Sequence, residues 1–316
     1  MHVEEIRNIA VVGAGLMGHG IAQECALCGY SVALTDVSAD ALDRARASIE
    51  ANLQTLVSRG ALTAERAAAV LPQIRACAQL GEALAGADFV IEAAAEDLAV
   101  KQNLFHQMDA LCPPQTILAS NTSTFMPTRL ASATRRPDRV LVAHYFNPPY
   151  LLPLVEVVCG EATSEETLQT TLALLTRMGK RPVHVRKEVP GFIGNRLQMA
   201  LLREALSLVE QGVATPQDVD AVIQNGFGRR LAAAGVFEVF DFGGWNLILA
   251  ILQMLLPEIA SSTEASRLLV EKVARGELGV KSGQGFYEWD ADTAQARKSA
   301  IAQTLIALAR LPSETR

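Results

Sequence analysis

A histidine and a glutamate are the side chains best suited to proton transfer in this sequence. His144 lies near the end of an apolar run, residues 139–145, and Glu156 lies in the middle of another, residues 154–158. A histidine accepts a proton near neutral pH, and a carboxylate inside an apolar strand is costly to bury without a partner. Pairing would orient the imidazole and raise its basicity, so we predict a general base at His144 supported by Glu156. The alternatives are a core histidine with satisfied hydrogen bonds and a glutamate that faces water.

A glycine-rich motif near the amino terminus predicts a nucleotide site. Residues 13–18 read Gly-Ala-Gly-Leu-Met-Gly, directly after the apolar run 8–12 and before a helical pattern that leads to a second strand ending in Asp36. This context makes the motif typical of dinucleotide binding. The Asp36 carboxylate would accept hydrogen bonds from ribose hydroxyls and repel a 2′-phosphate, which favours NAD over NADP. The alternative is a glycine-rich turn with a surface aspartate.

The residues of the motif have separate expected tasks. Gly13 permits the tight turn, Gly15 lets the backbone approach a pyrophosphate, and Gly18 allows close packing of helix and strand. The helix begins around Leu16 and Met17, and its free N–H groups and positive dipole end would face the phosphates.

Small polar residues form two further groups that could bind ligand. Residues 120–124 read Ser-Asn-Thr-Ser-Thr at the end of another apolar run, where Asn121 and Ser123 could hold the nicotinamide carboxamide and a substrate oxygen. Asn195 lies in residues 191–196, where a helical region begins, and we expect it to face a cleft between two domains. The alternative for the first group is a helix cap, with Thr124 as the capping residue.

The elements that position these residues change in character along the chain. Up to about residue 187, short apolar runs alternate with helical patterns, which predicts an α/β Rossmann-like doubly wound domain over residues 1–187. After the Pro190-Gly191 turn signal only helical patterns remain, so we expect an all-α domain over residues 188–316. The expected strands are residues 8–13, 31–36, 88–93, 116–121, 139–145, 154–158 and 182–186, the last three partly antiparallel. The expected helices are residues 16–28, 39–59, 98–111, 165–178, 191–212, 216–225, 245–256, 264–275 and 294–310.

Composition narrows the possible partners. The 28 basic and 34 acidic residues give a net charge of −6 without a basic stripe, so we expect a small-molecule substrate and no nucleic-acid partner. The apolar stretch 245–256 is too short to cross a bilayer, so we expect no membrane span there and predict a helix that is buried or at a subunit interface. The acidic, polar start does not resemble a signal peptide.

The cysteines predict neither a disulfide framework nor a metal site. Five scattered cysteines suit a reducing compartment, which favours the cytoplasm. Cys25 and Cys28 form a Cys-x-x-Cys late in a helical pattern, and no second pair completes a metal site. A redox role would place the pair at a helix amino terminus instead.

Taken together, these motifs resemble those of the 3-hydroxyacyl-CoA dehydrogenase family. The resemblance follows the family's order along nearly the whole chain. It implies a Rossmann-like domain, a helical domain through which the protein dimerises, and oxidation of the L-3-hydroxyl of a 3-hydroxyacyl-CoA, as in fatty acid metabolism. The matching segments are residues 13–18, 90–96 with Lys101, 120–124, 144–149, 154–158, 190–197 and 281–287.

The resemblance also implies roles for individual residues. His144 would take the hydroxyl proton while hydride leaves C3 for NAD, and Glu156 would pair with His144. Ser123 and Asn195 would contact the substrate oxygen. The residues implied on the nicotinamide side of the cofactor are Glu96, Lys101 and Asn121.

One segment departs from the acyl-CoA enzymes. Their Gly-x-Gly-Phe-Pro-Met-Gly-Pro segment is replaced at residues 226–236 by Gly-Phe-Gly-Arg-Arg-Leu-Ala-Ala-Ala-Gly-Val. This form is more similar to the branch acting on free hydroxy acids, such as gulonate or carnitine dehydrogenases, which resemble this chain in an arginine at the position of Arg230. An arginine can hold a carboxylate through two parallel hydrogen bonds, and a thioester has no carboxylate. The alternative is that Arg229 and Arg230 form a solvated surface pair.

Two other functions compete with this interpretation. The β-hydroxyacid dehydrogenases use a lysine on the helix that enters the second domain, and residues 192–209 contain no lysine. A non-catalytic, NAD-binding or structural protein would have no need to keep His144, Glu156, Ser123 and Asn195 together.

Overall fold

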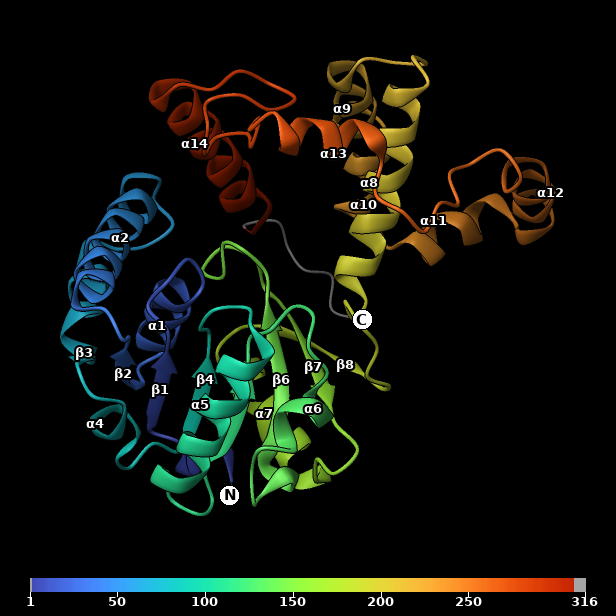
Figure 1. Cartoon of the computed structure of the whole chain (residues 1–316). Coiled ribbons are helices and arrows are strands. Elements are labelled where there is room, and N and C mark those ends of the chain that lie inside the picture. Colours follow the sequence, from blue (N-terminus) through green and yellow to red (C-terminus); the bar gives the residue numbers. More distant parts are fainter. Residues whose placement is uncertain (1, 310–316) are drawn as a thin grey trace. The chain divides into compact units, whose positions relative to one another are not determined.

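Eight strands form a single sheet in the first part of the chain (Figure 1). The computed structural model describes residues 2–309; one compact unit ends at Asn195 and a second begins at Arg196. The sheet order is β3-β2-β1-β4-β5-β6-β7-β8, and every neighbouring pair is parallel except β6 and β7. The strands are β1 (Asn8–Val12), β2 (Ser31–Thr35), β3 (Ile74–Cys77), β4 (Phe89–Glu92), β5 (Ile117–Ser120), β6 (Val140–Tyr145), β7 (Leu154–Cys159) and β8 (Arg181–Val185).

Helices cover both faces of this sheet and explain its almost continuously apolar strands. On one face Ile9 and Val11 of β1 join a core with α1 (Gly18–Leu27), α2 (Ala39–Ser58) and α7 (Glu165–Arg177). On the other face Ala10 and Val12 join a core with α4 (Leu80–Leu84), α5 (Leu98–Leu111) and α6 (Pro127–Ala131). The predicted fold class, a doubly wound α/β unit followed by helices, is confirmed.

Side-chain caps fix where several of these helices begin. Ser38 accepts a hydrogen bond from Ala41 N at the start of α2, and Asp97 accepts one from Val100 N at the start of α5. Each cap satisfies a backbone donor that has no partner inside its helix. The predicted starts of both helices therefore agree with the structure.

One strand and several short helices are not predicted by the sequence patterns. Strand β3 is an edge strand that exposes Arg75 and Ala76, so it lacks the apolar run that marks the central strands. The missed helices have five to eight residues, too few for a clear helical period. They are α3 (Ala64–Ala68), α4, α6, α10 (Phe227–Leu231) and α11 (Val236–Gly243).

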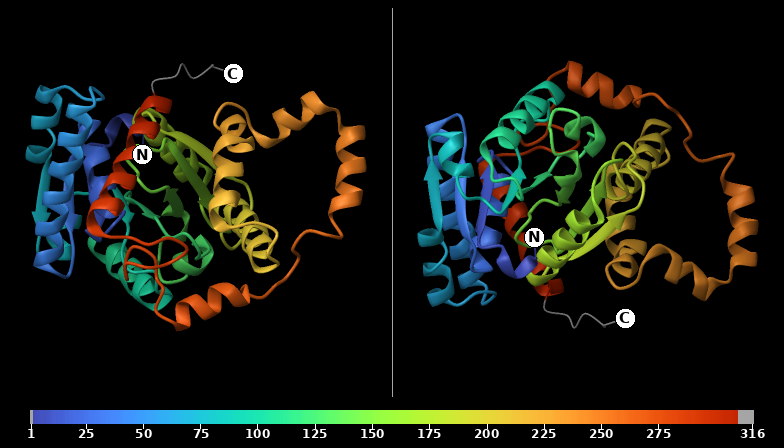
Figure 2. Two further views of the ribbon diagram at one scale, coloured as in Figure 1. Left: turned by 90° about the horizontal axis from the view of Figure 1, so that it is seen from above. Right: turned by 90° about the horizontal axis from the view of Figure 1, so that it is seen from below.

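The second unit consists of helices, as predicted. Besides α10 and α11 it contains most of α8 (Gly194–Glu210), with α9 (Pro216–Asn225), α12 (Trp245–Leu255), α13 (Arg267–Ala274) and α14 (Ala291–Ala309). Residue 310, the predicted end of the last helix, lies outside the described residues. An extended stretch joins α12 to α13 (Figure 2).

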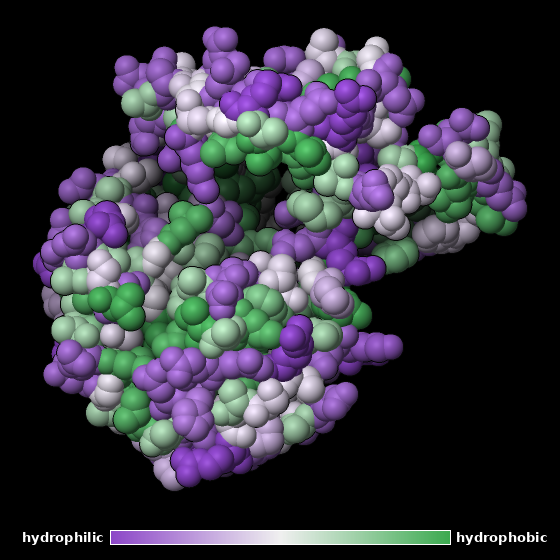
Figure 3. Space-filling model, in the orientation of Figure 1, coloured by the Kyte–Doolittle hydropathy of each residue, from purple (hydrophilic) through white to green (hydrophobic). Residues whose placement is uncertain are grey.

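Few side chains of the second unit are buried. Of residues 196–309, only Leu206, Ala294 and Ile306 are buried. Apolar side chains are exposed on α11 and α12, including Phe237, Phe242 and Leu249, and Figure 3 shows such side chains on the projection formed by these two helices. The helix predicted over residues 245–256 is therefore not buried within the described part of its own chain.

No single helix within residues 2–309 has the length and apolar character to cross a membrane. Helices α11 and α12 meet that test only when joined, and the chain bends by 107° between them.

Candidate active site

The residues predicted to do chemistry follow strands that end at one edge of the sheet. Strands β1, β2, β4, β5 and β6 run parallel, so the loops after them share this edge. The strand order reverses between β1 and β4, and ligands of such sheets bind outside the carboxyl ends at that point. Topology therefore brings the glycine loop, residues 93–97, residues 121–125 and the end of β6 to the same edge.

The glycine loop forms a tight turn onto α1 with room above it. Gly13 has a φ of 104°, and a Cβ at Gly18 would overlap the Gly13 carbonyl oxygen. A Cβ at Gly15 would meet no heavy atom within 4 Å. Within residues 2–309, no group accepts a hydrogen bond from the backbone N–H of Leu16 or Met17. Free donors, a helix amino terminus and open space at Gly15 fit the pyrophosphate of a dinucleotide.

Asp36 follows β2 and is held against the glycine loop. Its Oδ2 accepts a hydrogen bond from Ala14 N at 2.8 Å, and its Oδ1 accepts one from Ser38 N at 3.0 Å. The carboxylate therefore lies beside the cofactor loop in a fixed orientation. This is the position from which a carboxylate can bind the ribose of NAD.

His144 and Glu156 face each other across the antiparallel pair β6 and β7. They are register partners, so their side chains lie on the same face of the sheet. His144 Nδ1 and Glu156 Oε2 are 2.9 Å apart, and both residues are buried. Two aromatic rings flank the imidazole, with centroids 4.7 Å away for Phe146 and 5.7 Å away for Phe192.

Hydrogen bonds determine the charge of Glu156 and hence the tautomer of His144. Burial alone would raise the pKa of Glu156, but hydrogen bonds from His144 and from the backbone N–H groups of Gly194 and Ile193 outweigh it and lower the pKa. Both backbone donors lie 2.9 Å from Oε1. Because Glu156 is a carboxylate, Nδ1 of His144 must carry the hydrogen, which leaves Nε2 as the proton acceptor in the neutral ring.

A second carboxylate organises the loop after β5. Glu96 Oε1 accepts hydrogen bonds from Thr122 Oγ1 at 2.5 Å, from Thr124 Oγ1 at 2.6 Å and from Ser123 N at 3.0 Å. Burial would raise the pKa of Glu96, yet the bonds from Thr122 and Thr124 and the charge of Lys101 lower it. Thr124 caps no helix, contrary to one alternative, because α6 begins at Pro127 after Met126.

Lys101 lies beneath this loop between two acids. Its Nζ is 2.7 Å from Glu92 Oε1 and 3.3 Å from Glu96 Oε2, and the residue is 1% exposed. Glu92, which is fully buried, also accepts a 2.5 Å hydrogen bond from Ser120 Oγ. Lys101 therefore ties the loop after β5 to the end of β4 through these two acids.

Asn121, Ser123 and Asn195 lie close to one another and to the histidine. Asn121 Oδ1 accepts a hydrogen bond from Tyr145 N at 2.9 Å, which fixes the amide orientation and leaves Nδ2 as a donor. Asn195 Nδ2 donates to Ser123 O at 3.4 Å, and Asn195 directly follows the backbone bound by Glu156. The three residues are thus tied to one another or to the backbone next to His144 and Glu156.

Arg229 and Arg230 lie on α10 in the second unit. Arg229 donates to Gln224 O at 3.2 Å and to Asn225 Oδ1 at 3.4 Å. Arg230 is exposed, and its guanidinium group contacts no acceptor within residues 2–309. The two arginines therefore differ, since Arg229 is bonded to the end of α9 and no described acceptor bonds the Arg230 guanidinium group.

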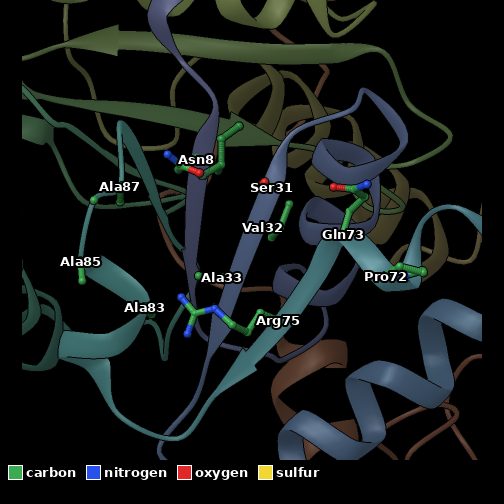
Figure 4. Close-up of a pocket in the computed structure, with 12 residues that line it drawn as sticks. Asn8, Ser31, Val32, Ala33, Pro72, Gln73, Arg75, Ala83, Ala85 and Ala87 are labelled. Carbon is green, nitrogen blue, oxygen red and sulfur yellow. The ribbon is translucent and has the colours of Figure 1, made fainter.

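One cavity lies away from these residues (Figure 4). It has a volume of about 330 Å³ and is lined at the amino ends of β1 and β2 by Asn8 and Ser31 and at β3 by Arg75. Ligands of a doubly wound sheet bind at the opposite, carboxyl edge. None of the predicted site residues lines this cavity.

Three supporting residues of the site were not predicted from the sequence. Glu92 pairs with Lys101, Ser120 donates a hydrogen bond to Glu92, and Phe146 contacts His144. Glu92 gave a signal, because it is an acid at the end of the apolar strand β4, the same reasoning that selected Glu156. Ser120 belongs to the polar group 120–124 but was not singled out in it, and Phe146 gave no signal, since a loop phenylalanine is common.

Comparisons with known proteins identify the family. The model for the NAD binding domain of 3-hydroxyacyl-CoA dehydrogenase matches residues 8–189, and the model for the C-terminal domain matches residues 191–289. A 3-hydroxybutyryl-CoA dehydrogenase of Bradyrhizobium diazoefficiens is 39% identical over 285 residues, covering 90% of this chain and 96% of that relative.

A second relative has a different substrate in its name. The 5-formyl-3-hydroxy-2-methylpyridine 4-carboxylate 5-dehydrogenase of Mesorhizobium japonicum is 34% identical over 306 residues, covering 97% of this chain and 98% of that relative. A crystal structure of an enzyme with this activity, described as an NAD+ dependent dismutase, matches with a TM-score of 0.91 at 34% identity, covering 97% and 98% of the two chains. The predicted family, cofactor and enzyme class are confirmed: the chain belongs to the 3-hydroxyacyl-CoA dehydrogenase family of NAD-dependent oxidoreductases.

Proposed function

We propose that the chain oxidises the L-3-hydroxyl of a 3-hydroxyacyl-CoA to the 3-keto product, with His144 as general base. The observation that carries this proposal is the buried His144–Glu156 pair at 2.9 Å. Nε2 of His144 takes the hydroxyl proton, and the C–H bond at C3 gives up its electron pair as hydride while the carbonyl forms. Glu156 then stabilises the imidazolium through the hydrogen bond it already makes.

The neighbouring residues hold substrate and cofactor in this proposal. Asn195 and the Ser123 hydroxyl bind the substrate oxygen on which charge develops. Asn121 donates to the carboxamide oxygen of the cofactor, while Glu96, kept ionised by its hydrogen bonds, accepts from the nicotinamide ribose. Gly13, Gly15 and Gly18 shape the pyrophosphate site with Leu16 and Met17, and Asp36 binds the adenosine ribose. NAD, when bound, supplies the hydride acceptor.

A second candidate is the same chemistry on a free hydroxycarboxylate held by Arg230. It is favoured by the altered segment 226–236 and by the exposed Arg230 guanidinium, which has no acceptor within the described chain, whereas Arg229 is tied to Gln224 and Asn225. The full-length similarity to an enzyme named for a pyridine carboxylate also supports it. Carnitine, gulonate and aromatic carboxylates belong to this substrate class.

One assay separates these candidates. NAD reduction is measured with L-3-hydroxyacyl-CoA thioesters and with free hydroxy acids, for the wild type, Arg230→Ala and the control Arg229→Ala. Turnover of thioesters with little effect of Arg230→Ala supports the first candidate. Turnover of free acids with a KM raised about tenfold or more in Arg230→Ala alone supports the second. NAD binding without turnover in either panel would contradict both and indicate a non-catalytic, NAD-binding protein.

We further propose a homodimer formed through the helical unit and located in the cytoplasm. The exposed apolar side chains of α11 and α12 support a subunit interface, since such surfaces are seldom left in water. The five free cysteines suit a reducing compartment. Light scattering of the purified chain tests the dimer, and a monomer at micromolar concentration would contradict it.

A further inference from the structure

The loop between the strands that carry His144 and Glu156 is attached to the cofactor helix. Residues 146–153 join β6 to β7, and they contact α1, the helix that follows the glycine loop. A Cβ at Gly20 of α1 would lie 2.6 Å from Pro149 Cγ, so the proline ring lies directly against the helix backbone. Tyr150 Oη donates to Asn52 Oδ1 at 2.9 Å, and Asn52 Nδ2 donates to the buried Gln23 of α1 at 3.1 Å.

A buried lysine makes the strongest of these attachments. Lys180, which is 5% exposed, donates from Nζ to the carbonyl oxygen of Pro149 at 2.6 Å and lies 3.4 Å from that of Leu152. The same ammonium group pairs with Glu24 Oε1 of α1 at 2.9 Å. The Lys180 ammonium group therefore links two loop carbonyl groups to α1. Hydrogen bonds from a charged donor are about twice as strong as neutral ones.

The loop in turn carries a ring that contacts the histidine. Phe146, the first loop residue, has its ring centroid 4.7 Å from that of His144. On its other side, a Cβ at Gly194 would lie 2.5 Å from Phe146 Cζ, so the ring packs against the backbone that Glu156 binds. A shift of the loop would therefore move a wall of the site that contacts His144 directly.

We propose that Lys180 is a positioning residue that fixes the His144 side chain through the loop 146–153. It acts by tying this loop to α1, and so connects the helix at the pyrophosphate site to the base. This inference rests on the proposed role of His144. Lys180 is not part of the cofactor motif, and within residues 2–309 its ammonium group bonds Glu24 and the loop carbonyl groups.

Selective labelling of histidine gives a readout that does not depend on turnover. The chain has five histidines, so a spectrum of protein labelled with ¹³C at the histidine Cε1 has few signals, and His144→Gln assigns the one of interest. Lys180→Met removes the charge at similar length, Lys180→Arg restores a charged donor, and Lys187→Met is the exposed control on the same segment.

We expect Lys180→Met to shift or broaden the His144 signal and to lower kcat about tenfold on whichever substrate the wild type oxidises, with KM for NAD changed less. Lys180→Arg should recover part of both effects, and Lys187→Met should show neither. A lower Tm with an unchanged His144 signal would overturn the proposal and make Lys180 a stability residue only.

A milder variant keeps the proposal testable if Lys180→Met fails to fold. Glu24→Gln leaves the lysine and its bonds to the loop but removes the ion pair with α1. We expect the same change of the His144 signal with smaller amplitude. An unchanged signal in this folded variant would contradict the link to the cofactor helix. If no substrate in the panels is oxidised, the proposed function fails while the signal still tests this inference.

Discussion

The two compact units of the chain bury their apolar side chains to very different extents. The first unit has two continuous cores on the faces of its sheet, whereas only three of residues 196–309 are buried. The first unit also pairs its buried charges, as Lys101 does with Glu92. The predicted site residues from Gly13 to Asn195 all lie in this unit. The second unit leaves a large apolar surface uncovered, which indicates that another surface completes it.

Because the first unit holds the predicted catalytic residues in a packed core, we expect the catalytic rate to depend on single side chains of that unit. We expect His144→Gln to lower kcat about 100- to 10,000-fold, the range of general acid–base catalysis, because Nε2 no longer accepts the hydroxyl proton. Affinity for NAD should change less than about twofold. Steady-state kinetics and fluorescence titration with NADH measure these effects. His184→Gln, an exposed change on β8, is the control, and a loss of kcat below tenfold would exclude His144 as the base.

Oligomeric state should depend on the second unit instead. Phe242 on α11 is 92% exposed, and we expect Phe242→Asp to weaken self-association by at least about 2 kcal/mol, or roughly 30-fold in Kd. Sedimentation velocity over a concentration series measures the change, and NADH binding should persist. The matched control is Leu111→Asp, an exposed leucine of the first unit. Equal effects of both changes would contradict the comparison between the units.

Cofactor preference should belong to the first unit alone. Asp36→Ala removes the carboxylate beside the glycine loop, so we expect the NAD to NADP ratio of kcat/KM to fall about 10- to 100-fold, as for a lost charged hydrogen bond. Asp40→Ala, at the exposed start of α2, should leave the ratio unchanged. A ratio that Asp36→Ala does not alter would remove the assignment of Asp36 to the ribose.

The smallest predicted effect is a difference in acid sensitivity. Glu156 and Glu96 have lowered pKa values in the folded chain, so their stabilisation is complete above the unfolded pKa near 4.5 and is lost as the pH falls through the folded pKa. We expect hydrogen exchange in β6 and β7 to accelerate as the pH falls below about 4.5, after correction for intrinsic rates. Glu156→Gln should reduce this pH dependence, and an unchanged dependence would contradict the role of its charge.

The features that were predicted best are those set by residue types close together in the sequence. Central strands such as β4 are buried throughout and apolar up to their last residue, and Glu156 stood out because an acid inside such a strand needs a partner. Strand β3 was missed because only its edge position, a tertiary property, makes it a strand. Lys101 was predicted near the cofactor, yet its burial between Glu92 and Glu96 depends on packing that spacing does not reveal.

Two glycines of the glycine loop are required for different reasons, one for folding and the other for cofactor binding. Gly18 is needed by the fold itself, since a side chain there would overlap the Gly13 carbonyl oxygen, whereas a methyl group at Gly15 meets nothing within 4 Å. We propose that the dinucleotide binds above Gly15, so a side chain there would obstruct the cofactor and not the fold. We therefore expect the Gly15→Ala protein to keep its fold and its proposed dimer interface but to lose NAD binding. In a cell, this variant would separate the effects that require catalysis from those that require only the folded protein.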